Sequence, residues 1–287
     1  METANLLTKL LPPTQTHLTC ADYQSALLEG VTRAQAATHK EYLLTLEGTS
    51  YPILADLPLL TLPYNDVEAL KEICREYPGQ IAGFLLEPVP TSQGLVLPNY
   101  GYLEEVSRIA EEQGFWLLFD ETTTLFQAAL GGAQTLYEVE PQLTCYRNVL
   151  FSKDDVLPQA GPLPLEIFED EMITEEEHYN LESLTAILAG GLERAARQYQ
   201  VPLQVHRLGA LYSIYFSAQP LQDYADYGLC DLELYSCFGQ SMLEQNIQLP
   251  ESQFTTNTLP LSTTAEAIED FLQKADKACV ACAQKAE

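Results

Sequence analysis

The sequence predicts an α/β protein that combines a mainly parallel sheet in its first half with a smaller α+β unit in its second half. Two fully apolar runs, at 81–86 and 115–119, have the length of buried strands, and a helical pattern lies between them. Strand, helix and strand at this spacing are typical of a right-handed βαβ unit. After Leu150 the composition changes. We therefore expect two domains, over residues 1–165 and 166–287.

The first half alternates between helical and extended patterns. Apolar residues follow a period near 3.6 in the helical segments, and Gly114 supplies a C-terminal stop. Prolines at 52, 58 and 63 predict an irregular connection between two of these elements. The expected helices are 20–40, 67–77 and 102–113, and the expected strands are 42–46, 81–86 and 115–119.

The second half starts with a proline-containing loop and an acidic run, and then returns to regular patterns. It reads as an acidic linker followed by a small α+β domain. The expected loop is 151–165, the helices are 181–199, 232–245 and 264–283, and the extended segments are 211–216 and 252–254.

The net charge excludes several classes of partner. Asp and Glu number 41 against 14 Lys and Arg, which leaves −27. Nucleic acid and anionic membranes would be repelled, because both are bound through Lys and Arg. The charge serves solubility or forms a docking surface for a basic protein. No run reaches the roughly 18 apolar residues of a membrane span. The N-terminus lacks the features of a signal peptide, so we expect a cytoplasmic protein.

The cysteines and the acidic run give weak signals for metal or redox chemistry. Seven cysteines, an odd number, favour reduced thiols. Cys279 and Cys282 form a lone CxxC. The two cysteines either pack as small apolar residues or take part in zinc binding or redox chemistry. Residues 175–178 are three glutamates and a histidine, but adjacent positions do not share a helix face, which favours a solvated face over a metal site. We therefore expect no metal.

Acidic residues follow both apolar strands. Glu87 comes directly after the first strand, and Asp120 and Glu121 end the second. Ligands of open α/β sheets bind at the carboxyl ends of the strands. This edge is therefore the expected ligand site.

Several segments in order resemble one family. Residues 81–134 read IAGFLLEPVPTSQGLVLPNYGYLEEVSRIAEEQGFWLLFDETTTLFQAALGGAQ, with LTLPYND at 60–66 and MLEQNIQLPESQF at 242–254. They resemble the class III (fold type I) pyridoxal-phosphate aminotransferases, and within that family the glutamate-1-semialdehyde 2,1-aminomutases. The resemblance covers most of residues 18–285. It implies a truncated large domain with a mainly parallel sheet, a small C-terminal domain, and a dimer with its active site at the subunit interface.

The resemblance also implies where the cofactor groups would lie. Asp120 matches the aspartate that pairs with the pyridinium nitrogen, although a strand-end carboxylate satisfied by backbone N–H groups is the alternative. The position of the Schiff-base lysine, which must be a primary amine, holds Asn148. The nearest lysine is Lys153. Tyr51 stands where the family places a ring-stacking segment.

The phosphate-binding segments are altered as well. Cys20-Ala21-Asp22 replaces a Ser-Gly-Thr turn, and a carboxylate there would repel a phosphate. In a second segment the family reaches across the dimer with a Gly-Thr pair. Here Gln159-Ala160-Gly161 is followed by Pro162, which has neither a hydroxyl nor an N–H. Residues 1–17 hold no counterpart of the family's N-terminal region with its substrate-binding arginine.

From these departures we expect a degenerate relative that works without the cofactor, as a non-catalytic binding or structural subunit. It would form a homodimer, or a heteromer with a related or basic protein. The first alternative is cofactor-free chemistry in the old cleft, where Arg147 either binds an anion or is a surface residue. The second is a pyridoxal-phosphate aminotransferase or aminomutase that uses Lys153. The polar candidates for the cleft are Asp22, Tyr51, Glu87, Asp120, Glu121, Tyr146 and Arg147.

Overall fold

The computed structural model describes residues 16–92, 94–153, 157, 173–222 and 225–286. Their contacts divide the chain into two compact units. Unit 1 comprises residues 1–89 and 98–173, and unit 2 comprises residues 90–97 and 174–287.

The units differ in one respect from the expected domains. Segment 90–97, which we expected in the first domain, groups with unit 2. The expected boundary between residues 165 and 166 lies outside the described residues.

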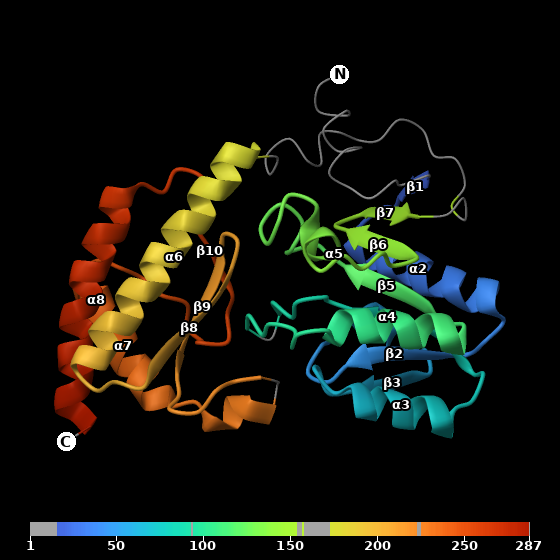
Figure 1. The fold of residues 1–287 in the computed structure, drawn as a ribbon, viewed down its shortest axis with the longest axis horizontal. Coiled ribbons are helices and arrows are strands. Elements are labelled where there is room, and N and C mark those ends of the chain that lie inside the picture. The colour runs from blue at the N-terminus through green and yellow to red at the C-terminus, as the bar shows by residue number, and fades with distance from the viewer. Residues whose placement is uncertain (1–15, 93, 154–156, 158–172, 223–224, 287) are drawn as a thin grey trace. The chain divides into compact units, whose positions relative to one another are not determined.

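Unit 1 is built on a seven-stranded sheet in the order β1-β7-β6-β5-β4-β2-β3 (Figure 1). The five strands from β6 to β3 run parallel, whereas β7 and β1 are antiparallel to their neighbours. Strand β4 is apolar and buried along its whole length, as a parallel strand covered on both faces must be. The strands are β1 (Thr16–Thr19), β2 (Tyr42–Leu46), β3 (Leu59–Leu62), β4 (Ile81–Leu86), β5 (Trp116–Asp120), β6 (Leu143–Tyr146) and β7 (Val149–Ser152).

Helix α2 (Tyr23–Thr38) packs closely on this sheet. Its buried face contains small residues, and a side chain added at Gly30 would meet Leu118 at 3.4 Å. The close approach places the first turn of α2 near the carboxyl ends of β5 and β6. The remaining helices of unit 1 are η1 (Pro52–Leu54), α3 (Val67–Glu76), α4 (Tyr102–Gln113) and α5 (Gly132–Leu136).

The predicted strand, helix and strand are confirmed. Strands β4 and β5 are parallel neighbours, with α4 between them in sequence. Gly114 ends α4 with a φ of 65°, a left-handed conformation that glycine adopts at low cost. Asp66 begins α3 as its N-cap, because its side chain accepts a hydrogen bond from the Ala69 N–H at 2.8 Å.

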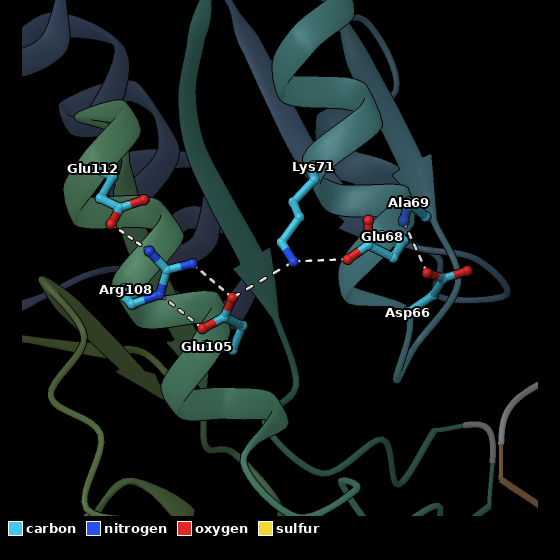
Figure 2. A network of polar contacts seen from close by, with 7 residues as sticks. All are labelled: Asp66, Glu68, Ala69, Lys71, Glu105, Arg108 and Glu112. Atoms are coloured by element: carbon cyan, nitrogen blue, oxygen red, sulfur yellow. Dashed lines mark hydrogen bonds and ion pairs between the residues drawn. The ribbon is translucent and has the colours of Figure 1, made fainter.

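A chain of ion pairs joins α3 to α4 (Figure 2). Lys71 Nζ lies 2.7 Å from Glu68 Oε1 and 3.7 Å from Glu105 Oε1. Arg108 pairs with Glu105 at 2.6 Å and also with Glu112. These side chains are partly or largely exposed, so each pair contributes little to stability.

Unit 2 is a three-stranded antiparallel sheet, in the order β10-β9-β8, with helices packed against it. Helix α8 contacts both α6 and α7, and α6 also packs on β8. The elements are α6 (Glu175–Gln198), β8 (Leu203–Leu208), β9 (Leu211–Phe216), η3 (Ala225–Leu229), α7 (Leu232–Glu244), β10 (Asn257–Thr258) and α8 (Ala265–Ala286).

Segment 90–97 is tied to unit 2 by hydrogen bonds. The carbonyl of Leu95 lies 2.7 Å from His206 Nδ1, and the Thr256 hydroxyl donates to the carbonyl of Thr91 at 2.9 Å. Gly94, at a φ of 88°, lets the chain pass the hydroxyl of Tyr215, which an added Cβ would approach to 2.3 Å. These contacts explain why eight residues leave the first unit.

Some expected elements differ in the structure. Helix α6 begins at Glu175 instead of 181, because Thr174 and Glu177 form a capping box. The prediction of an extended segment at 252–254 is wrong, because these residues form a bend and a turn. The short strand β10 follows at Asn257–Thr258. The expected loop 151–165 begins inside β7. The periodicity of the sequence did not predict the strands β1, β3, β6 and β8. Strands β1, β3 and β6 have four residues each, too few for a period to be recognised, and β8 does not alternate between buried and exposed positions.

Among the described helices, none combines the length and the apolar composition needed to cross a membrane.

Candidate functional site

The candidate site lies at the carboxyl ends of β4, β5 and β6. Leu85, Leu118 and Leu143 are register partners on the face that α2 covers. Side chains two residues apart on a strand share a face. The next positions on this face are therefore Glu87, Asp120 and Cys145.

Asp120 is held by two hydrogen bonds. The Tyr23 hydroxyl donates to Asp120 Oδ2 at 2.5 Å, and the Thr122 N–H donates to Oδ1 at 3.2 Å. Burial raises the pKa of Asp120, and the negative charge of Glu87 raises it further, while the bonds from Tyr23 and Thr122 oppose the rise. The carboxyl group that the resemblance assigns to the cofactor nitrogen is thus already bonded to a phenol.

Tyr23 was missed in the sequence. It is the first residue of α2 and reads there as an ordinary helical position. Its bond to Asp120 spans 97 residues, so only the packing of α2 on the sheet reveals it. The aromatic residue directly after the N-cap was the only local signal.

Tyr51 lies beside the same carboxylates. It is buried, and its hydroxyl has no hydrogen-bond partner in the part of the chain that the structure describes. Burial raises the pKa of Tyr51, and the charges of Asp120 and Glu87 add to the rise. A buried phenol without a partner is energetically costly and points to a place where a polar group could bind.

The N-terminus of α2 is capped from within the chain. Asp22 Oδ1 accepts a hydrogen bond from the Ser25 N–H at 2.7 Å, and this bond holds the pKa of Asp22 below its ordinary value. A carboxylate therefore occupies the position where a helix N-terminus would bind a phosphate.

Asn148 and Arg147 form the two-residue turn between β6 and β7. The Asn148 amide donates to the Cys20 carbonyl at 3.1 Å, and the Cys20 N–H donates to the Asn148 carbonyl at 2.8 Å. These bonds join the start of α2 to the turn. Arg147 has a φ of 51°, is exposed, and places its guanidinium 5.7 Å from the centre of the Tyr146 ring.

Lys153 lies at the other end of the sheet. Because β6 and β7 are antiparallel, Ser152 pairs with Leu143 at the start of β6, and the Lys153 N–H donates to the Gln142 carbonyl at 3.4 Å. Asp120 pairs with Cys145 near the end of β6. The structure does not bring Lys153 and Asp120 together.

Glu121 has a structural role. It is fully buried and accepts hydrogen bonds from the N–H groups of Ala133 at 3.0 Å and Gln134 at 2.7 Å, and from the Thr124 hydroxyl. Burial raises the pKa of Glu121 to about 7. The Glu121 carboxyl group accepts the N–H groups at the N-terminus of α5, which favours a structural role over a role in binding.

The residues present do not fit pyridoxal phosphate. The turn that would carry the amine holds Arg147 and Asn148, and the helix N-terminus that would hold the phosphate is capped by Asp22. Asp120, the expected partner of the ring nitrogen, bonds to Tyr23. The stretch 159–162 of the second phosphate-binding segment lies outside the described residues.

A metal centre finds no support either. No group of three or more His, Cys, Asp or Glu side chains among the described residues could hold a metal ion. Cys279 and Cys282 are buried in α8, and Cys282 Sγ lies 3.8 Å from the Leu234 carbonyl.

Three relatives show what the chain resembles. No family model matches it. It is 32% identical over 251 residues to a glutamate-1-semialdehyde 2,1-aminomutase of Natranaerobius thermophilus, covering 78% of this chain and 58% of the relative. It is 34% identical over 238 residues to the protein of that name from Desulfitobacterium hafniense, covering 74% of this chain and 55% of the relative. For that of Roseiflexus castenholzii the identity is 26%, over 96% of this chain and 75% of the relative. The chain thus spans little more than half the length of the first and second of these relatives.

Solved structures share the fold. An omega-transaminase from Sphaerobacter thermophilus matches with a TM-score of 0.81 and 20% identity, over 98% of this chain and 77% of that one. A glutamate-1-semialdehyde-aminomutase from Pseudomonas aeruginosa, in complex with PMP, matches with a TM-score of 0.80 and 15% identity, over 96% and 74%. The mixed, mainly parallel sheet is that of the fold type I aminotransferases.

Proposed function

Because the chain belongs to the class III (fold type I) aminotransferase family, as a homologue of the glutamate-1-semialdehyde 2,1-aminomutases, we propose that it is a degenerate member that binds other molecules and does not catalyse. It works without pyridoxal phosphate. It acts as a homodimer, or as a subunit beside a related or basic protein.

The hydrogen bond from Tyr23 to Asp120 is the observation that carries this proposal. It engages the carboxylate that would have to face a cofactor nitrogen, at a distance of 2.5 Å. A ring nitrogen bound there would have to share this carboxylate with the Tyr23 hydroxyl or displace it. Displacement would leave the phenol without its acceptor, at a cost of about 1–3 kcal/mol.

The two ends of the cofactor would lose their partners as well. A phosphate at the start of α2 would meet the Asp22 carboxylate, which is already bonded to the Ser25 N–H. An aldehyde at the β6–β7 turn would meet an amide and a guanidinium, neither of which is a nucleophilic amine. Three independent changes therefore support the same conclusion.

A second function has one observation in its favour. The unpartnered hydroxyl of Tyr51, beside Asp120 and Glu87, could hold a small ligand in a cofactor-free reaction or a binding role. Catalysis through Lys153 is less well supported, because that lysine lies at the opposite edge of the sheet from Asp120.

Equilibrium dialysis against pyridoxal phosphate tests the proposal. We expect no saturable binding near one molecule per chain. We expect the same of Asn148→Lys, because restoring an amine leaves Asp22 and Tyr23 in place. Stoichiometric binding to the unmodified protein would refute the cofactor-free reading.

A further inference from the structure

Unit 2 carries a groove of about 610 Å³ between α7 and the segment 248–253. The residues that α7 contributes follow the spacing i, i+3, i+4, i+7, i+8 and i+11, which is one stripe along the helix. The lining residues from α7 are Leu232, Tyr235, Ser236, Gly239, Gln240 and Leu243.

The stripe is apolar at both ends and open in the middle. Leu232 is 62% exposed and Leu243 is 54% exposed, whereas Phe238 and Met242 on the other face of α7 are fully buried. A Cβ added at Gly239 would meet no atom within 4 Å. Two exposed leucines on a groove with a glycine floor are typical of a surface that receives side chains from outside.

The chain segment that forms the groove carries charge of a single sign. Residues 208–273, a stretch of 66, contain no Lys, Arg or His. Glu233 and Glu244 are exposed and directly follow the lining residues Leu232 and Leu243, and the exposed Glu251 lines the groove. The nine acidic residues of the stretch are Asp223, Asp226, Asp231, Glu233, Glu244, Glu251, Glu266, Glu269 and Asp270.

We propose that the α7 groove, defined by these lining residues, binds a basic amphipathic helix of a partner protein. The inference rests on the proposed role as a binding subunit and names its surface. Leucine-type side chains of the partner cover Leu232 and Leu243 and enter the space above Gly239, while its Lys and Arg face Glu233, Glu244 and Glu251.

The geometry favours this occupant over the others. Helix α7 has 13 residues and is about 20 Å long, which suits a partner helix of three to four turns. A second copy of this chain would bring the same acidic rim against the groove and be repelled. A small apolar ligand would leave the three rim carboxylates without partners.

Fluorescence anisotropy with synthetic peptides tests the inference near physiological salt. The probe is a labelled leucine–lysine peptide of about 14 residues with an apolar i, i+3, i+4, i+7 stripe. A peptide of the same composition in scrambled order removes the stripe, and a leucine–glutamate peptide reverses the charge. We expect saturable one-to-one binding of the first alone.

Variants locate the binding. Gly239→Leu fills the groove without changing the charge, and Leu243→Ser removes an apolar contact; each should weaken binding about tenfold or more. The control is Ile187→Ser on α6, since Ile187 is 52% exposed, as Leu243 is 54%, but lies outside the lining; it should change binding less than about twofold.

Three results would overturn the inference. The first is that the scrambled peptide binds as tightly as the amphipathic one. The second is that Gly239→Leu binds the amphipathic peptide as tightly as the unmodified protein does. The third is that the protein self-associates without peptide and Leu243→Ser abolishes this, which would make a second copy the occupant. The experiment involves no cofactor, so its failure would leave the cofactor-free proposal standing, and pyridoxal-phosphate binding would not affect the peptide result.

Discussion

Tyr23 and Asp120 form a buried hydrogen bond at the carboxyl edge of the sheet. The Tyr23 hydroxyl donates a hydrogen bond to the buried Asp120 carboxylate. Tyr51 and Glu87 lie around the same group, so that burial and like charges raise the pKa of Asp120. Asp120 thus receives two hydrogen bonds from the chain itself, and the Tyr51 hydroxyl near it has no partner among the described residues.

Removing the Tyr23 hydroxyl should destabilise the protein. Tyr23→Phe deletes the donor to a buried carboxylate, and we expect the free energy of unfolding to fall by about 1–3 kcal/mol. Urea denaturation measures it. Tyr100→Phe is the matched control, because Tyr100 is fully exposed, and its stability should not change. An unchanged midpoint for Tyr23→Phe would mean that the bond is not important in solution.

Glu121 should make stability fall as the pH rises. Burial raises its pKa from 4.5 to about 7, so the folded state holds a proton that the unfolded state has released between these values. The contribution is full below about pH 4.5 and is lost as the pH passes 7, with a slope of at most about 1.4 kcal/mol per pH unit.

A pH series of urea denaturation measures that slope. Glu121→Gln, which cannot titrate, should flatten it between pH 4.5 and 7, whereas Glu140→Gln at an exposed position should not. Equal slopes in the unmodified protein and Glu121→Gln would contradict the buried, protonatable carboxyl.

At the residue scale, local rules predicted where part of the candidate site lies. Asp120 was predicted from its place at a strand end, and Glu87 likewise, because the carboxyl ends of parallel strands meet at one edge. The role of Tyr23 depends on its contact with Asp120 of β5, and that of Glu121 on its contact with α5. Periodicity within one element cannot report such contacts.

At the scale of elements, the close packing of α2 on β4 holds the site together. Gly83 of β4 has no side chain, and an added Cβ would lie 2.9 Å from Leu118 Cδ1 and 3.2 Å from Ala34 Cβ. The helix can approach the sheet only because this position is a glycine. The first turn of α2, with Asp22 and Tyr23, then reaches the strand ends.

A single methyl group should test this packing. Gly83→Ala should lower the free energy of unfolding by about 1–3 kcal/mol, because the added carbon also lies 3.2 Å from the Trp116 carbonyl oxygen, which cannot move aside cheaply. Gly228→Ala, where nothing lies within 4 Å, should change it by less than about 0.5 kcal/mol. Similar stabilities of the two variants would contradict the tight contact of α2 with β4.

The elements that were predicted share one property, which is length. The helices at 102–113 and 232–245 contain enough residues to show their period, and the strands at 42–46 and 81–86 contain enough to show a mostly apolar run. The structure confirms all four within one residue. Strands β1, β6 and β7 have four residues each, and their pairing joins residues 16–19 to 149–152. A four-residue strand carries too little pattern, and only the sheet as a whole stabilises it.

At the scale of the molecule, the fold and the chemistry were predictable to different degrees. The resemblance of residues 81–134 identified the family, and the relatives and the shared fold agree with it. The charge of −27 left solubility and a docking surface for a basic protein as alternatives, and the location of the groove on α7 needed the structure. Fold does not by itself determine function, so the conclusion depends on the groups at the site.

The most direct test of the account is covalent trapping of pyridoxal phosphate. The protein is incubated with the cofactor, reduced with borohydride, and its intact mass is measured, with peptide mapping of any product. The account predicts the unmodified mass, because neither Arg147 nor Asn148 can form a Schiff base and Lys153 lies at the far edge of the sheet from Asp120. A stoichiometric adduct on one lysine, Lys153 above all, would contradict it and return the protein to the catalytic members of its family.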